Sequence, residues 1–259
     1  MTSRLVVLGS CGAWPEPGGA CSGYVLEYRG YRVVLDLGYG TLSRLLELLG
    51  SVSADGLDAV VVTHHHPDHM VDLHALFRAR WFGRRGAPSL PLYSTPEVYA
   101  MLVALQDGDD TELRQVFDLH PLPAGPYELG PFQLTSVSLP HFVANAGIRL
   151  SSADFTLAYT GDTGPDPALV DLGRDADLYM MEATARDQQV STPPSTAVPR
   201  MHLRASEAGQ AAADARARRL LLTHFWPGND RAQSAEAAAR VYDGEILVAR
   251  DGLEIPLLA

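Results

Sequence analysis

The feature that most constrains how this chain can fold is a turn rich in imidazole groups, Thr63-His64-His65-His66-Pro67-Asp68-His69. It follows an apolar run at 57–62 that is typical of a buried strand. It leads into residues 70–77, whose apolar side chains recur at helical spacing and predict a helix from about 69 to 80. So many imidazoles in one strand-to-helix turn indicate that the turn has a function.

The spacing within this turn directs its polar side chains toward one point. Because side chains alternate along a strand, His64 and His66 project to the same side and His65 points away. The chain then turns, so Asp68 and His69 can approach the same point from another direction. These residues predict a metal site with more ligands than a single ion needs.

The composition is that of a soluble globular protein with ample core. The chain has 259 residues, of which 46% are hydrophobic and 20% charged. Its formal net charge is −11, and all 20 basic residues are arginine. This acidic balance argues against a broad nucleic-acid-binding surface, although bound cations can still create a local positive pocket. With no linker or low-complexity segment, we expect one domain over residues 1–259.

Cysteine usage and hydropathy predict where the protein resides. Only Cys11 and Cys21 are present, and the first residues lack a secretory layout. No apolar run approaches the roughly 20 residues that a membrane-spanning helix needs. We therefore expect a cytoplasmic protein with reduced thiols and no contact with a membrane.

Other polar residues recur at the carboxyl ends of apolar strands. His141 follows one such strand, Asp162 lies in Gly-Asp-Thr-Gly after another, and His224 ends a third. In α/β architectures functional sites gather at these ends. The candidates suit two metals about 3.5–4 Å apart that share a carboxylate, since one tetrahedral zinc needs only four ligands. The full set is His64, His66, Asp68, His69, His141, Asp162 and His224.

The remaining pattern predicts an α/β fold, with two sheets covered by helices. The predicted strands lie at 4–8, 24–28, 31–35, 57–62, 90–93, 147–150, 155–159, 177–181, 220–222 and 245–248, with β structure throughout 114–141. Further helices are predicted at 41–49, 96–105, 167–172, about 206–218 and 235–241. Ser206 is the candidate N-cap of the fourth of these.

The His-x-His-x-Asp-His signature, the later His, the Gly-Asp-Thr and the final Thr-His resemble the motifs of the metallo-β-lactamase superfamily, in order from residue 4 to about 224. The resemblance implies a four-layer αββα sandwich of two mixed β-sheets flanked by helices, with a dinuclear site at one edge. It implies one metal held by His64, His66 and His141, a second held by Asp68, His69 and His224, and a bridge through Asp162.

The implied cofactors are two divalent metal ions. Zinc is the first expectation, and manganese or iron suit the same ligands. Asp68 has a second candidate role as proton acceptor for the attacking water. Asp36, at the end of a predicted strand, is a candidate hydrogen-bond partner for a ligand imidazole, and a turn residue is the alternative.

Two more residues resemble an extra pair in the ribonuclease Z branch of the superfamily. Glu182 ends a predicted strand, and His202 lies in His-Leu-Arg-Ala-Ser-Glu-Ala-Gly. In that branch the His meets the scissile phosphate and the Glu orients it. A protonated His202 could stabilise charge or donate a proton to the leaving oxygen. A salt-bridged pair that stabilises the Pro-, Ser- and Thr-rich segment 191–199 is the alternative.

One departure from ribonuclease Z limits the substrate. That family carries a long tRNA-grasping arm between the third metal His and the bridging Asp, whereas only about twenty residues separate His141 from Asp162. The compact layout resembles bacterial cyclic-nucleotide phosphodiesterases of the same branch. We therefore predict a dinuclear metal-dependent phosphodiesterase that acts on a cyclic nucleotide, a small nucleotide or a short RNA 3′ end through a metal-bridging hydroxide.

Several alternatives stay open on the sequence. They are a tRNA 3′-processing endoribonuclease, a thioesterase, lactonase or glyoxalase-like hydrolase on the same metals, and a non-catalytic metal-binding scaffold. The complete ligand set argues against the scaffold. Related enzymes are often dimers, so a homodimer is one expectation. A basic cluster could contact a phosphate, although a solvated helix end is the favoured interpretation for Arg78, Arg80, Arg84 and Arg85.

Overall fold

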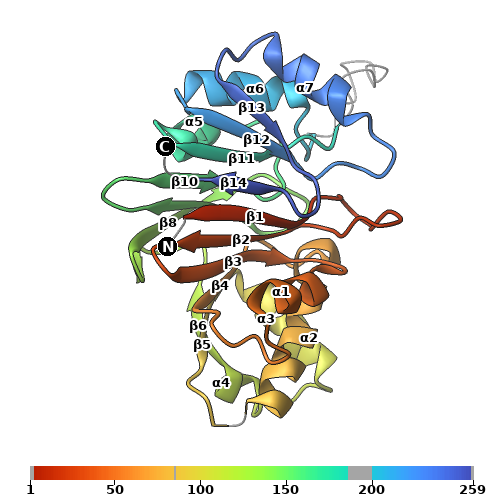
Figure 1. Ribbon diagram of the computed structural model, residues 1–259, viewed down its shortest axis with the longest axis vertical. Coiled ribbons are helices and arrows are strands. Elements are labelled where there is room, and N and C mark those ends of the chain that lie inside the picture. The colour runs from red at the N-terminus through yellow and green to blue at the C-terminus, as the bar shows by residue number, and fades with distance from the viewer. Residues whose placement is uncertain (1–2, 85, 186–199, 258–259) are drawn as a thin grey trace.

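The computed structural model describes residues 3–84, 86–185 and 200–257. Arg85 and the segment 191–199 therefore lie outside the described residues. The strands form two seven-stranded sheets that pack face to face, with helices on both outer sides (Figure 1). This is the predicted α/β sandwich of four layers.

The first sheet is mixed. Its strands are β1 (Arg4–Gly9), β2 (Gly23–Tyr28), β3 (Tyr31–Leu37), β4 (Ala59–Val62), β5 (Leu90–Ser94), β6 (Phe117–Pro121) and β14 (Glu254–Pro256). They lie in the order β14-β1-β2-β3-β4-β5-β6. The pairs from β14 to β3 are antiparallel, and those from β3 to β6 are parallel.

The second sheet repeats this change of direction. Its strands are β7 (Tyr127–Leu129), β8 (Phe132–Leu139), β9 (Asn145–Ser151), β10 (Thr156–Tyr159), β11 (Leu178–Glu182), β12 (Arg219–Thr223) and β13 (Glu245–Val248). They lie in sequence order from β7 to β13 across the sheet. Pairs from β7 to β10 are antiparallel, and those from β10 to β13 are parallel.

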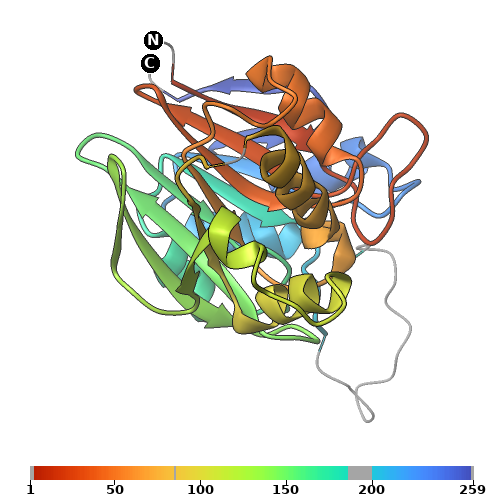
Figure 2. The ribbon, with the colours of Figure 1, turned by 90° about the horizontal axis from the view of Figure 1, so that it is seen from below.

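The helices cover the outer faces of the sheets (Figure 2). The first sheet carries α1 (Thr41–Leu49), α2 (Pro67–Gly83), α3 (Pro96–Leu105) and the short α4 (Leu113–Val116). The second carries α5 (Ala168–Gly173), α6 (Ala205–Asp214) and α7 (Arg231–Ala239). Within the part of the chain that the structure describes, no helix has both the length and the apolar character that a membrane crossing demands.

Alternation along the strands divides the apolar side chains among three core layers. In β1, Leu5 and Val7 pack between the two sheets, whereas Val6 and Leu8 pack beneath the helices of the first sheet. All four are buried, and full burial of each such side chain contributes about 1.5–3 kcal/mol. The sheets are therefore fixed on both faces, which makes them a rigid support for the loops at their edges.

Two tyrosines join the sheets at the end where the site lies. The hydroxyl of Tyr24 in β2 hydrogen-bonds the Thr223 hydroxyl in β12 at 2.5 Å. The hydroxyl of Tyr159 in β10 donates to Asp36 in β3 at 2.7 Å. The two rings meet edge to face, with centroids 5.4 Å apart. These contacts fix one sheet against the other directly under the loops that carry the candidate ligands.

Some predicted boundaries are wrong, and local hydrogen bonds explain several of them. Ser206 is not the N-cap of α6, which begins at Ala205: Arg204 is the N-cap, and the carboxylate of Glu207 accepts its N–H. Helix α7 begins four residues before the predicted start, since the Asp230 side chain accepts two N–H groups of its first turn. Helix α4 interrupts the predicted β region 114–141, and β14 was not predicted.

Candidate metal centre

The candidate ligands come together because the strands that precede them end at the same edge of the sandwich. Within the second sheet β8, β10 and β12 run in the same direction, and in the first sheet β4 runs parallel to β3. The loops after these strands therefore meet. They supply His64 and His66 after β4, His141 after β8, Asp162 after β10, and His224 after β12.

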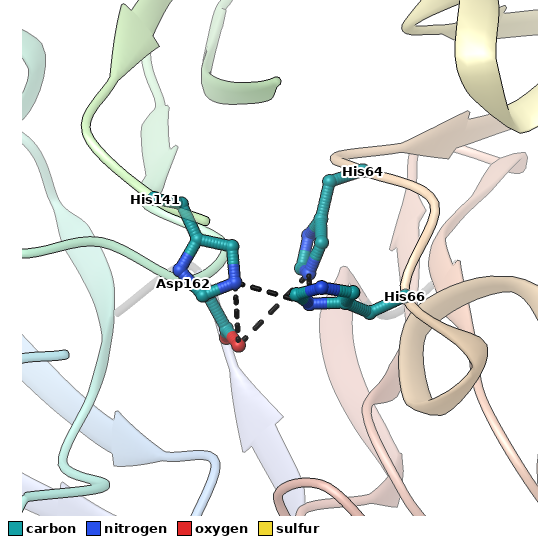
Figure 3. A group of neighbouring side chains, drawn as sticks. All are labelled: His64, His66, His141 and Asp162. Atoms are coloured by element: carbon teal, nitrogen blue, oxygen red, sulfur yellow. Dashed lines mark hydrogen bonds and ion pairs between the residues drawn. The ribbon is translucent and has the colours of Figure 1, made fainter. Parts of the chain in front are cut away.

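A first cluster consists of three imidazoles and a carboxylate (Figure 3). Nδ1 of His66 lies 3.1 Å from Nε2 of His64 and 3.1 Å from Nε2 of His141. An Asp162 oxygen lies 3.7 Å from the latter nitrogen. Nitrogens that bind one tetrahedral zinc at about 2.1 Å lie roughly 3.4 Å from one another. The spacing of this cluster therefore fits a metal ion at its centre.

A second cluster is formed by the first turn of α2 and the loop after β12. Nε2 of His224 lies 3.1 Å from Asp68 and 3.3 Å from Asp162. Nε2 of His69 lies 3.3 Å from the other oxygen of Asp162. Asp162 thus belongs to both clusters, which is the geometry expected of a carboxylate that bridges two ions.

Two buried atoms of the second cluster, which lie 3.3 Å apart as an ion pair, have no partner in hydrogen-bond geometry among the residues that the structure describes. They are Nε2 of His69 and Oδ1 of Asp162. Leaving a buried polar atom unsatisfied typically costs about 1–3 kcal/mol. Both atoms face the centre of the cluster and are metal-ligand atoms by type, so the donor set fits a bound cation.

The electrostatics of the first cluster favour metal ligation. Burial and the neighbouring His69 lower the pKa of His64 well below its usual range. Burial likewise lowers the pKa of His141 to about 4, against the opposing charge of Asp162, and lowers that of His66. Neutral imidazole is the form that binds a metal, so these side chains are prepared as ligands at neutral pH.

The second cluster holds an excess of negative charge. Burial opposes a proton on His69, but the carboxylates of Asp162, Asp68 and Asp36 outweigh it and raise the pKa of His69 well above its usual range. The surrounding imidazoles in turn outweigh burial and hold the pKa of Asp162 well below its usual range. Divalent cations can replace that proton as the positive charge among the carboxylates.

The outward nitrogen of several imidazoles is held by the protein. Nδ1 of His69 lies 2.8 Å from Asp36, as expected for the predicted partner of a ligand. Nδ1 of His141 lies 3.0 Å from the Met201 carbonyl oxygen, and Nδ1 of His224 lies 2.6 Å from the Thr184 hydroxyl. These bonds fix the rings so that the opposite nitrogen faces the cluster.

Three of the eight described non-glycine residues with positive φ lie at this edge. Ala13, Asp36 and His224 have φ angles of 63°, 57° and 53°, a left-handed conformation that is costly without glycine. Each touches the centre: Asp36 and His224 through their side chains, and Ala13 through its N–H, which donates to Asp68 at 2.6 Å. Such strain persists only where the surrounding structure enforces it, and it clusters at functional sites.

Glu182 and His202 form a pair beside the two clusters. Nδ1 of His202 lies 3.0 Å from Glu182, whose other oxygen accepts the Thr163 N–H at 2.5 Å. Burial opposes charge on His202, but Glu182 outweighs it and raises the pKa of His202 to about 9. Burial raises the pKa of Glu182 as well. We place the shared proton on His202 because Glu182 already accepts the Thr163 N–H.

His202 itself faces the metal ligands. Its ring centroid lies 5.1 Å from that of His141 and 6.0 Å from that of His224, and it stacks nearly parallel to the latter. The side chain is only partly buried. A proton donor is therefore held at the border of both clusters, where a ligand of the metals would meet it.

The remaining histidines do not belong to the metal centre. His74 bonds Gln106 and His120 stacks on Tyr93, and neither belongs to a cluster of candidate ligands among the described residues. His65 is also outside these clusters. The basic residues near the end of α2 are also distant from the ligands, because the twelve residues from Asp68 to Arg80 span roughly 18 Å of helix.

The three described members of the basic cluster on α2 make local contacts. The Arg80 side chain is buried and donates to the Ala54 carbonyl. Arg84 pairs with Asp55 at 2.8 Å. The Arg78 guanidinium lies over the Phe82 ring, 4.5 Å from its centroid. The favoured interpretation of a solvated helix end is therefore wrong for Arg80, which anchors a loop.

Some contacts to the ligands could not be found from the sequence. The Met201 carbonyl and the Ala13 N–H are backbone groups, which every residue type carries, so no residue pattern marks them. The position of Thr184 is a weak indication of its contact with His224. Thr184 lies two residues after Glu182 at a strand end, where a hydroxyl can reach a neighbouring loop.

The sandwich and its paired His/Asp clusters define a metallo-hydrolase of the β-lactamase type. A family model described as β-lactamase superfamily domain matches residues 31–225, and the chain belongs to that superfamily. Over 261 residues it is 29% identical to the probable metallo-hydrolase YhfI of Bacillus subtilis (strain 168), covering 96% of this chain and 98% of the relative. The crystal structure of YhfI superposes with a TM-score of 0.82 at 27% identity, covering 98% of this chain and 99% of YhfI.

Two further relatives cover nearly the whole chain. An uncharacterized protein of Mycobacterium leprae (strain TN) is 33% identical over 258 residues, covering 95% of this chain and 86% of its own. A ribonuclease Z of Haloferax volcanii is 26% identical over 312 residues, covering 99% and 96%. The chain is thus a member of the β-lactamase superfamily of metallo-hydrolases, and ribonuclease Z is among the proteins it is similar to.

Proposed function

We propose that this protein is a dinuclear metal-dependent phosphodiesterase that acts on a small nucleotide, a cyclic nucleotide or a short RNA 3′ end. The observation that carries the proposal is the Glu182–His202 pair, in which Glu182 holds the His202 imidazole against the edge of both clusters. His64, His66 and His141 would hold one ion, and Asp68, His69 and His224 the other, with Asp162 shared. Zinc is the first candidate, since three imidazoles suit it.

The chemistry of phosphodiester cleavage needs this set of groups. Divalent ions, when bound, screen the charge on the phosphoryl oxygens and activate water for attack. The protein adds a proton donor, His202, for the oxygen of the leaving group, and Glu182 keeps that imidazole charged and oriented. Asp68 would accept a proton from the attacking water as well as bind a cation. A thioester has less need of a second acid, because a thiolate leaves readily.

The loops around the site favour a small substrate. The interval between His141 and Asp162 contains β9 and a tight connection to β10, so no arm extends from it. The net charge of −11 also disfavours a long contact with an RNA backbone. Among the relatives, the name ribonuclease Z supports phosphodiester chemistry, and the short interval favours substrates smaller than tRNA.

Metal reconstitution tests the proposed activity directly. Chelated protein, reloaded with Zn²⁺ or Mn²⁺, is assayed on bis-p-nitrophenyl phosphate, 3′,5′- and 2′,3′-cyclic nucleotides, a dinucleotide and a tRNA precursor. We expect metal-dependent turnover of the small phosphodiesters and little processing of the tRNA precursor. Absence of turnover on every phosphodiester, with metal content verified, would refute the proposal.

The His202→Ala variant separates phosphodiester from thioester chemistry. Loss of a general acid should lower kcat by about 10²–10⁴-fold on a cyclic nucleotide or dinucleotide, whose alkoxide leaving group needs a proton. Any thioester hydrolysis should change by less than about tenfold, because it does not depend on this donor. His74→Ala is the matched control, since His74 bonds Gln106 away from the clusters. Equal losses on both substrates would contradict the role of His202 as acid for the leaving oxygen, and thioester turnover that is unaffected while no phosphodiester is cleaved would favour the thioesterase, lactonase or glyoxalase-like alternative.

A further inference from the structure

Three large aromatic side chains lie exposed beside the metal centre. Trp14 is 50% exposed, Trp226 38% and Phe142 65%. Each lies within two residues of a group that contacts the centre: Ala13, His224 and His141 respectively. Large apolar side chains are costly to leave in water, so their gathering at one functional edge points to a ligand that covers them.

The two tryptophans form a single surface. Their ring centroids lie 5.9 Å apart and their planes are inclined at 48°. Trp14 belongs to the loop after β1, and Trp226 follows the His224 ligand after β12, so the two rings come from different sheets. The pair stands next to the second cluster, because the Ala13 N–H beside Trp14 donates to Asp68.

The loop that carries Trp14 is fixed before any ligand binds. Its Gly12 N–H donates to the Phe225 carbonyl at 2.8 Å, and a side chain at Gly12 would collide with the His224 ring at 2.7 Å. The Trp14 N–H closes a tight turn on the Gly12 carbonyl at 2.8 Å, around the strained Ala13. The backbone that carries the Trp14 ring is therefore held by hydrogen bonds, and the ring itself packs against Trp226.

An ion pair clamps the far side of the same loop. Arg231 at the start of α7 pairs with Glu16 at 2.9 Å. Its guanidinium also donates to the Ser10 hydroxyl and to the Ala249 carbonyl. A loop that is fixed at both ends and presents an exposed indole is preorganised, so little entropy is lost when a ligand packs on it.

We propose that Trp14 and Trp226 form a stacking platform for the planar base of a nucleotide whose phosphodiester lies at the metal centre. This inference rests on the proposed phosphodiesterase function and deepens it by assigning the residues that hold the base. Indole faces stack on any base, which suits recognition without hydrogen bonds to a particular base edge. Stacking also requires no positive charge, which is consistent with the acidic composition.

Two chromogenic substrates test the platform. Thymidine 5′-p-nitrophenyl phosphate and methyl p-nitrophenyl phosphate share a leaving group, and only the first carries a base. In the metal-loaded protein, Trp14→Ala and Trp226→Ala should each lower kcat/KM on the thymidine ester about tenfold, mainly through KM. The methyl ester should change less than twofold, and Trp14→Phe should retain most activity on both.

The control variant is Phe82→Ala. Phe82 is also an exposed ring, at 55%, but it lies at the opposite end of α2 from Asp68 and should leave both substrates unaffected. Equal effects of Trp14→Ala on the two esters would overturn the platform while leaving the phosphodiesterase function in place. Equal effects of Phe82→Ala and Trp14→Ala on the thymidine ester would overturn it too.

Fluorescence gives a readout that does not depend on turnover. The chain has three tryptophans, and a base stacked on two of them should quench their emission. AMP should quench the metal-loaded protein more strongly than inorganic phosphate does, and the Trp14→Phe/Trp226→Phe variant should lose that difference. If no phosphodiester is turned over, the proposed function fails and this titration still decides the platform. Equal quenching by AMP and phosphate would overturn it.

Discussion

In four imidazoles of the metal centre, Nδ1 forms a hydrogen bond with another group of the protein, and Nε2 faces the candidate metal sites. The partners are the Asp36 carboxylate, the Thr63 hydroxyl, the Met201 carbonyl and the Thr184 hydroxyl, for His69, His64, His141 and His224. Because these partners orient the rings, a change in one of them should alter metal binding without removing a ligand.

Asp36→Asn tests this at the most connected partner. Asp36 accepts bonds from Tyr159, from the Thr63 N–H and from His69. The amide lacks the negative charge and one acceptor oxygen, so His69 should lose its fixed orientation. We expect metal affinity to fall about 10–100-fold, measured by competition with a chromophoric chelator.

Asp58→Asn is the matched control for this substitution. Asp58 accepts the Arg32 N–H at 2.7 Å, in contact with none of the candidate ligands. It should leave metal affinity unchanged even if it lowers the free energy of unfolding. If both variants weakened metal binding equally, the orienting role of Asp36 would be wrong and a general loss of stability would explain the effect.

At the scale of elements, the site depends on how closely the loops after the strands approach. Gly38 follows β3, and a Cβ there would lie 1.8 Å from the backbone oxygen of Asp68 in the first turn of α2. The absence of a side chain thus permits α2 to begin against β3. The start of α2 carries two candidate ligands, so this contact sets their position.

Gly38→Ala should displace the start of α2. We expect lower metal affinity together with a lower Tm, because neither backbone segment can move without disturbing a buried layer. Gly50→Ala is the comparison: Gly50 caps α1 with φ of 62° and has open space around it. That variant should lower Tm, through the cost of a left-handed alanine of roughly 1–2 kcal/mol, while metal affinity stays the same. Unchanged metal affinity in Gly38→Ala would contradict the prediction.

Elements with strong periodic patterns could be predicted from the sequence. Short elements, and helix ends that are set by a capping residue, could be predicted less well. The turn at 63–69 and the apolar strands before each ligand indicated where the site lies, because the period of the apolar residues and the polarity of the sequence change there. The start of α7 was missed although Asp230 is a favourable cap, since the apolar pattern in that helix is weak. The four-residue α4 and three-residue β14 depend on tertiary contacts that a local pattern does not carry.

Contacts between residues that are distant in the sequence cannot be predicted from local sequence patterns. The metal motifs indicated which side chains converge, because the resemblance assigned them together. The bond from the Ala13 N–H to Asp68 joins residues 55 positions apart and involves a backbone donor. Such a contact follows only from how the strands of the first sheet are arranged, which brings the loop after β1 to the start of α2.

At the scale of the molecule, the candidate ligands come from both halves of the sandwich. The segment after β4 contributes four of them, and the loops of the second sheet contribute the other three. Bound ions would therefore connect the two halves across the edge of the interface. Since the unfolded chain offers no preformed site, metal binding should stabilise the folded state.

Metal removal should lower Tm substantially. A ligand present at 1,000 times its Kd stabilises by about 4 kcal/mol, which corresponds to a shift of roughly 8–16 °C for a chain of this size. Differential scanning calorimetry of chelated and Zn²⁺-reloaded protein measures the shift, with EDTA-treated and reloaded Asp162→Ala protein as control. A Tm independent of metal in the native chain would contradict this role.

The strained positions at the centre carry a consequence for any attempt to make this protein more robust. Ala13, Asp36 and His224 each adopt a conformation that costs about 1–3 kcal/mol, and each does so where it touches the ligands. A screen that selects only for heat resistance would favour glycine at position 13, where the methyl group makes the left-handed backbone costly. The same substitution would free the turn that presents Trp14. Selection for thermal stability and selection for turnover should therefore favour different residues at position 13. The native alanine is the residue that we expect selection for turnover to retain.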